Sequence, residues 1–271
     1  MITLESAKDQ LMLDDARRIV EEASQEGIHL RLLGAIAIRL NASKHADLFL
    51  RLNRLNSENK FTDIDLAAYG KQRIQVRRLL QDLGFEVNQQ SLLMHGNSRM
   101  IFEHAQKRYS LDVFFDKLQF SHEVQFGRRP DEGRLGLNPL TLPPADLVLE
   151  KLQIHEINEK DLKDLVLLFA ANAIGNTEDE NVINGKHIAS TLSDDWEFWY
   201  EAKLNLEKLL KFLANYVNEK LVDADVETTV RSRVEELTKL IAEEPKSKDW
   251  QKRSRAGPEK KWWRDVEERT R

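Results

Sequence analysis

The hydrophobic positions at the start of the chain change their spacing at two glycines. Between residues 5 and 26, apolar side chains recur every three to four positions, which predicts an amphipathic helix that ends near Gly27. From Ile28 to Leu32 the apolar positions alternate, as they do in a strand. Helical spacing returns after Gly34, so we expect a strand-to-helix turn at that glycine.

The pattern up to about residue 126 mixes strands with helices. Residues 43–60 are mostly polar and predict a connecting insert with a helical turn or two. Two apolar runs, 99–105 and 108–116, are separated by a short polar stretch and predict a hairpin. The other elements expected here are a strand at 61–69, a helix at 71–84, an extended piece from residue 85 and an edge strand within 117–126.

After a loop rich in glycine and proline, the pattern becomes helical. Pro143 and Pro144 suit the first turn of a helix, and Asn158 is a candidate N-cap for the next one. The pattern also predicts a loop at 176–185 and two long amphipathic helices, at 193–218 and 225–243.

This order of elements predicts an α+β fold. Strands mixed with helices come first and a run of helices follows, which is typical of a mixed-sheet module with a helical partner. We expect the sheet module at residues 1–125, a helical domain at 126–245 and a charged tail at 246–271.

The composition is that of an ordinary globular protein, with 41% hydrophobic and 32% charged side chains among 271 residues. The chain contains no cysteine, which excludes disulfides and a thiolate zinc site. The first ten residues lack the pattern of a signal peptide, and the longest strongly apolar stretch, 165–174, is shorter than the roughly 20 residues that cross a bilayer. We therefore expect a cytoplasmic protein that does not enter a membrane.

The charge is distributed unevenly along the chain. Residues 246–271 contain ten Lys/Arg and five Asp/Glu, a net charge of +5, whereas the whole chain has a net charge of −5. The body is therefore acidic and is not a general nucleic-acid-binding surface. The basic tail also carries Trp250, Trp262 and Trp263, which leaves three alternatives open: an RNA-binding segment, a docking segment for a partner protein, or a solvated helix.

Two aspartates interrupt the apolar run predicted as the second strand. Asp63 and Asp65 stand at positions i and i+2, so their side chains point to the same face, roughly 6–7 Å apart at the backbone. Two carboxylates on one face of an apolar strand are unfavourable unless a cation compensates them, and Mg²⁺ typically takes one or two carboxylates together with substrate phosphates. The alternative is an edge strand with one solvated face, which fits poorly because both faces carry apolar residues.

A third acid and a glycine turn extend this pattern. Asp112 interrupts another apolar strand, and three acids on adjacent strands can hold metal for a displacement at phosphorus. Its alternative is an edge-strand residue that prevents aggregation. Gly34 opens a helix N-terminus, where backbone N–H groups can approach a phosphate closely because no Cβ intervenes.

The order of these features resembles the nucleotidyltransferase superfamily. The stretches "LLGAIAIRL", "DIDL" and "SLDVFFD" carry the glycine turn, the paired acids and the later acid. The stretch "DLVLEKLQIHEINEKDLKDLVLLF" is similar to a helical motif of uncharacterised bacterial nucleotidyltransferases related to toxins of type IV toxin–antitoxin (abortive-infection) systems. The resemblance spans roughly residues 28–172. It implies a mixed sheet with helices behind it, Mg²⁺ as cofactor and a nucleoside triphosphate as donor.

The resemblance also implies roles for single residues. Asp63 and Asp65 would bind the metal, and Asp112 would be its third ligand and the base. Gly34 and Ala35 would form the turn that seats the triphosphate.

In the helical motif, Lys151 would face the phosphates or the acceptor, and Lys160, Asp161 and Asp164 would match the charged stretch of the downstream helix. The alternative for Lys151 is a boundary lysine whose ammonium reaches water. The alternative for Lys160 and Asp164 is a routine surface ion pair at i,i+4.

Two further features have two interpretations each. His95, Gly96 and Arg99 lie beside a strand and either contact phosphate or base or form an ordinary polar turn. The aromatic cluster of Trp196, Trp199 and Tyr200 is expected in the helical core, with base stacking as its alternative.

Two departures from the superfamily pattern concern the donor. Ala35 replaces the usual second glycine or serine, and Asp63 follows Gly34 by 29 residues, a longer spacing than is common there.

The chain is expected to move a nucleoside monophosphate from a triphosphate such as ATP to an acceptor hydroxyl. The acceptor is RNA such as tRNA, a small molecule or a protein, and a toxin-like chain would have a cognate antitoxin. The rival expectation is a non-catalytic nucleotide- or RNA-binding module of the same fold.

Overall fold

The computed structural model describes residues 7–54, 61–106 and 108–266. The chain divides into two compact units, and each is a separate body with its own core. The first unit takes its described residues from the stretch up to Ser43, from Asn53–Leu118 and from Gln125–Pro143; the second takes them from Lys44–Leu52, Gln119–Val124 and Pro144 onward.

A five-stranded sheet in the order β1-β2-β5-β4-β3 forms the centre of the first unit. Strands β2 (Asp63–Ala68) and β5 (Ser110–Phe115) are parallel neighbours in its middle. The remaining pairs are antiparallel: β1 (Leu30–Leu33) with β2, β4 (Arg99–His104) with β5, and β3 (Phe85–Val87) with β4. The predicted combination of helices with a mixed sheet is confirmed.

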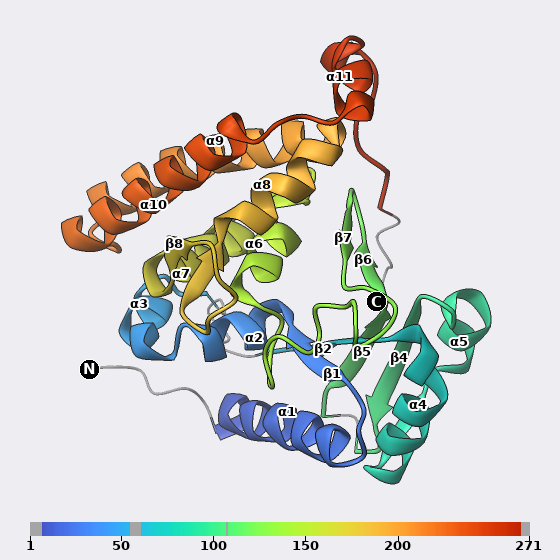
Figure 1. Ribbon diagram of the computed structural model, residues 1–271. Coiled ribbons are helices and arrows are strands. Elements are labelled where there is room, and N and C mark those ends of the chain that lie inside the picture. Colours follow the sequence, from blue (N-terminus) through green and yellow to red (C-terminus); the bar gives the residue numbers. More distant parts are fainter. Residues whose placement is uncertain (1–6, 55–60, 107, 267–271) are drawn as a thin grey trace. The chain divides into compact units, whose positions relative to one another are not determined.

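All but one of the helices of this unit were predicted. They are α1 (Ala7–Gln25), α2 (Gly34–Asn41), α4 (Arg73–Asp82) and the exception, α5 (Gln89–His95), with a 3₁₀ turn at Gly70–Gln72. Helix α1 packs against β1 and α4 (Figure 1). Its buried face has the helical spacing read from the sequence and consists of Met12, Leu13, Ala16, Ile19, Val20 and Ala23.

The first unit extends to Pro143, past the boundary expected at residue 125. The reason is hydrogen bonding to the sheet. The Leu32 N–H donates to the Leu140 carbonyl at 3.0 Å, and the Leu142 N–H donates to the Leu32 carbonyl at 2.8 Å. The Tyr69 hydroxyl also accepts from the Leu135 N–H at 3.1 Å. These bonds hold the loop beside β1.

The second unit is mainly helical. Its helices are α3 (Ala46–Arg51), α6 (Pro144–Leu152), α7 (Glu159–Ala171), α8 (Gly185–Asp194), α9 (Trp196–Asn218), α10 (Ala224–Glu243) and α11 (Lys248–Ser254). Helices α9 and α10 lie side by side (Figure 1). Asn158 caps α7 as predicted, because its side chain accepts from the N–H groups of Lys160 and Asp161.

Several elements differ from the expectation. The edge strand expected within 117–126 is absent from the main sheet; β6 (Lys117–Gln119) and β7 (Glu123–Gln125) pair with each other instead. The loop expected at 176–185 ends in a strand, β9 (Val182–Asn184), which pairs in parallel with β8 (Ala173–Gly175). Helices α5 and α8 were not predicted.

The described part of the chain includes no helix that combines the length and the apolar character needed to cross a bilayer.

Candidate functional site

The three predicted acids share one face of the sheet. Asp65 on β2 pairs in register with Asp112 on the parallel strand β5, so the two side chains are direct cross-strand neighbours. Asp63 precedes Asp65 by two residues and therefore points to the same face. Both strands have neighbours on each side, so the edge-strand alternatives for these acids are wrong. Asp112 is the most buried of the three, with 7% of its surface exposed.

Gly34 lies directly against the Asp65 carboxylate. The glycine has a φ of +70°, and a Cβ placed on it would be 2.5 Å from Asp65 Oδ2. Leu33 and Asp65 are register partners, which explains why the turn out of β1 meets this acid. Gly34 and Ala35 form the first turn of α2, and the N-cap residue Leu33 provides no side-chain hydrogen bond to it. The structure therefore combines the acids with a helix N-terminus in one unit.

Arg99 binds the third acid, Asp112. This contact was not predicted from the sequence. The Arg99 Nε donates to both oxygens of Asp112, at 2.7 and 2.9 Å, and its Nη2 donates to Oδ2. The guanidinium also lies over the Phe114 ring, 5.0 Å from the centroid. Arg99 is the first residue of β4, not part of the polar turn considered for it, and Ile101 two residues on is the register partner of Asp112. His95 and Gly96 end helix α5 and form its C-terminal turn.

The residues present fit a hard divalent cation in donor type, although no group of three or more His, Cys, Asp or Glu among the described residues is arranged as a metal site. Asp63, Asp65 and Asp112 present carboxylate oxygens on one face, which are the ligands that Mg²⁺ prefers. The arginine on Asp112 shows that this face already attracts a positive charge.

Lys151 lies in a buried cluster of charges in the second unit. Its ammonium is 3.1 Å from Glu150, 3.2 Å from Asp161 and 3.2 Å from Asp164. Lys151 is 6% exposed and Asp164 is fully buried. The boundary-lysine alternative is therefore wrong, because the ammonium is enclosed and paired.

The cluster includes two of the three residues matched to the downstream helix. Asp161 and Asp164 on α7 both contact Lys151 on α6, whereas Lys160 is exposed. The structure thus groups the predicted residues into two constellations: Gly34 with the three acids in the first unit, and Lys151 with its carboxylates in the second.

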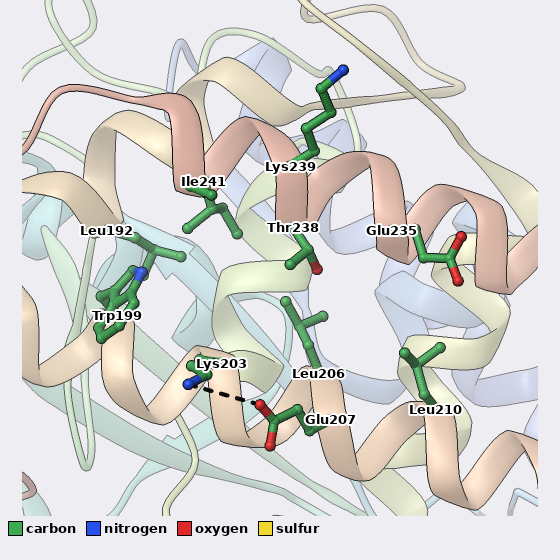
Figure 2. Close-up of a pocket in the computed structure, with 11 residues that line it drawn as sticks. Leu192, Trp199, Lys203, Leu206, Glu207, Leu210, Glu235, Thr238, Lys239 and Ile241 are labelled. Carbon is green, nitrogen blue, oxygen red and sulfur yellow. Dashed lines mark ion pairs between the residues drawn. The ribbon is translucent and has the colours of Figure 1, made fainter.

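A groove was not predicted from the sequence. Helices α8, α9 and α10 line this groove, which has a volume of about 490 Å³ and lies within the second unit (Figure 2). Its walls are apolar and include Leu192, Trp199, Leu206 and Ile241, and the ion pair between Lys203 and Glu207 (3.9 Å) lies at its rim. Trp196 is buried as expected for a core residue, while Trp199 and Tyr200 are half-buried.

The tail tryptophans contact their own unit. Trp262 Nε1 donates to Glu201 Oε2 at 2.8 Å, Trp263 stacks on His155 with centroids 3.9 Å apart, and Trp250 packs edge-on against Trp199. The described part of the tail, 246–266, is therefore a docked segment of the second unit, and the solvated-helix alternative is wrong for it.

No family model, curated protein or solved structure matches this chain. The chemistry of the candidate site therefore follows from its own geometry.

Proposed function

We propose that this protein is a magnesium-dependent nucleotidyltransferase of the nucleotidyltransferase fold, which moves a nucleoside monophosphate from a nucleoside triphosphate to an acceptor hydroxyl. One observation carries the proposal. Asp65 and Asp112 are register partners on parallel central strands, with Asp63 on the same face and Gly34 against Asp65. Carboxylates side by side on a sheet are unfavourable unless cations compensate them, and a divalent ion with oxygen ligands does so well.

The residues of the first unit have distinct roles in this proposal. Asp63 and Asp65 would hold Mg²⁺, with Asp112 as the third carboxylate, and the bound ion would neutralise the charge that develops on the transferred phosphate. The first-turn N–H groups of α2, from Gly34 and Ala35, would donate hydrogen bonds to the triphosphate oxygens. Asp112 would also take the proton of the attacking hydroxyl.

The charged cluster of the second unit acts indirectly in this proposal. Lys151 is enclosed by Glu150, Asp161 and Asp164, so we assign it a positioning role in which it holds α6 and α7 together. Lys160 is exposed and remains a candidate contact for the triphosphate or the acceptor. The acceptor itself is RNA such as tRNA, a small molecule or a protein, and the toxin-like interpretation adds a cognate antitoxin as partner.

A second candidate is a non-catalytic module that binds nucleotide or RNA. Two observations favour it: Ala35 stands where the superfamily has glycine or serine, and Arg99 already neutralises Asp112. Such a module would bind a triphosphate without turnover.

Transfer of label separates the two candidates. The pure protein is incubated with α-labelled nucleoside triphosphates, Mg²⁺ and total RNA or protein. We expect wild type to transfer label and Asp65→Asn to lose at least about a hundredfold of the rate, because a metal ligand supplies several kcal/mol to the transition state.

Asp14→Asn is the matched control, since Asp14 lies on α1 with 61% of its side chain exposed. Its rate should equal that of wild type. Triphosphate binding that survives Asp65→Asn, with no transfer by any variant, would favour the binding module and contradict the enzyme.

A further inference from the structure

Arg99 and the proposed metal would share one ligand. The guanidinium binds Asp112 through two nitrogens, and the Asp112 side chain is 11% exposed while that of Arg99 is 26% exposed. A planar, two-pronged contact of this kind is the strong form of an arginine–carboxylate pair. The positive charge that a metal would bring to Asp112 is therefore already supplied by the chain itself.

The sheet register explains why Asp112 needs a positive charge beside it even when no metal or nucleotide is bound. Asp65 and Asp112 are direct cross-strand partners, and neighbouring strands are about 4.8 Å apart. Like charges placed directly opposite each other destabilise a sheet. Arg99, held over Phe114, relieves this repulsion from the neighbouring strand β4.

We propose that Arg99 is an internal counter-cation that competes with the divalent metal for Asp112 and so sets the metal affinity of the site. This inference rests on the proposed function. Metal loading then requires the Arg99–Asp112 pair to open, and the released guanidinium becomes available to the anionic triphosphate. Arg99 is thus a positioning residue that keeps the carboxylate neutralised until metal arrives.

Arg73 provides a matched control in the same unit. It too lies over an aromatic ring of β5, Phe115, at 5.2 Å from the centroid. Phe115 neighbours Phe114 in the strand, so its side chain points to the opposite face from that of Asp112. The Arg73 Nη2 donates to the Asn97 carbonyl.

The test is Mn²⁺ binding, measured by the electron paramagnetic resonance signal of the free ion. We expect Arg99→Gln to bind Mn²⁺ at least about tenfold more tightly than wild type, because a hydrogen-bonded charge pair no longer competes. The Mn²⁺ affinity of Arg99→Lys should lie between those of wild type and Arg99→Gln, since lysine keeps the positive charge but cannot bind the carboxylate through two nitrogens. Arg73→Gln should bind Mn²⁺ with the wild-type affinity. Adding Asp112→Asn to Arg99→Gln should remove the gain in Mn²⁺ affinity. Far-UV circular dichroism confirms that each variant is folded.

The outcomes separate this inference from the proposed function. If wild type and Arg99→Gln bind Mn²⁺ equally, or the variant binds more weakly, while Asp65→Asn abolishes binding, the metal site stands and the role of Arg99 is wrong. If wild type and every variant bind no Mn²⁺, the proposed function fails and this inference fails with it. If Arg99→Gln binds Mn²⁺ and wild type does not, Arg99 blocks the metal site completely, which supports the inference.

Discussion

At the scale of single residues, Gly34 meets two requirements at once. Its φ of +70° lies in the left-handed region, and its missing Cβ leaves room for Asp65 Oδ2. Gly27 has almost the same φ, +71°, but nothing lies within 4 Å of its Cβ position. Comparing substitutions at the two glycines therefore separates the cost of backbone strain from the cost of contact with the Asp65 carboxylate.

We expect Gly27→Ala to lower the free energy of unfolding by about 1 kcal/mol, which is the strain of an L residue in that conformation. Gly34→Ala should lower it by about 3 kcal/mol, since Asp65 and the new methyl group must also move apart. Urea unfolding followed by far-UV circular dichroism measures both losses. Equal losses would mean that the Asp65 carboxylate does not lie against Gly34.

The sequence identified Gly34 and the three acids because each interrupts an apolar run. It did not identify the bond between Arg99 and Asp112, since that bond depends on the register of β4 with β5. Register is set by pairing across the sheet, and a polar neighbourhood around Arg99 resembles an ordinary turn. The grouping of Gly34 with the acids was thus predictable, whereas the pairing of Asp112 with Arg99 was not.

At the scale of elements, strong periodicity predicted most helices and strands, and weak periodicity explains those that were missed. Helix α5 leaves Leu93 and Met94 exposed, at 86% and 65%, so its apolar positions do not mark a buried face. Helix α8 begins at Gly185, a residue normally associated with loops. Strands β6 and β7 have three residues each, too few for alternation to show.

Helices α6 and α7 depend on one buried lysine. Replacing Lys151 by Met would leave Glu150, Asp161 and Asp164 in the interior without their shared cation. We expect Lys151→Met to destabilise the second unit by about 3–5 kcal/mol, because the three carboxylates lose the buried ammonium that they share. Urea unfolding followed by tryptophan fluorescence measures this loss.

The control for this change is Lys203→Met. Lys203 pairs with Glu207 at 3.9 Å, with about half of each side chain exposed, so its loss should be within about 0.5 kcal/mol. A similarly small effect of Lys151→Met would show that the cluster is open to water.

At the scale of the whole molecule, the units are assembled from segments that are distant in sequence. All five tryptophans belong to the second unit, so their fluorescence reports on that unit alone. Its tail reaches back to residues 119–124: the Arg264 N–H donates to the Ser121 carbonyl at 3.2 Å, and its guanidinium pairs with Glu123 at 3.0 Å. Local patterns do not encode such long-range contacts, which is why the unit boundaries could not be predicted.

A buried carboxylate joins this tail to α9. Glu201 is 2% exposed and accepts hydrogen bonds from His155 Nδ1 and Trp262 Nε1, both at 2.8 Å. Burial by itself raises the pKa of Glu201, but His122, His155 and Trp262 more than offset this, so the pKa is below its ordinary value of 4.5. A lowered pKa in the folded state means that deprotonation stabilises the fold.

The stability that Glu201 contributes should therefore be complete above pH 4.5 and should be lost as the pH falls through the lowered pKa of the folded state. Tryptophan fluorescence in urea, followed from neutral pH downward, measures this loss in the second unit. Glu201→Gln should be less stable than wild type at neutral pH and should lose less on acidification. Glu207→Gln, which changes a half-exposed acid on the same helix, should keep the wild-type pH dependence. If Glu201→Gln and wild type lose the same stability in acid, the tail is not held through this carboxylate.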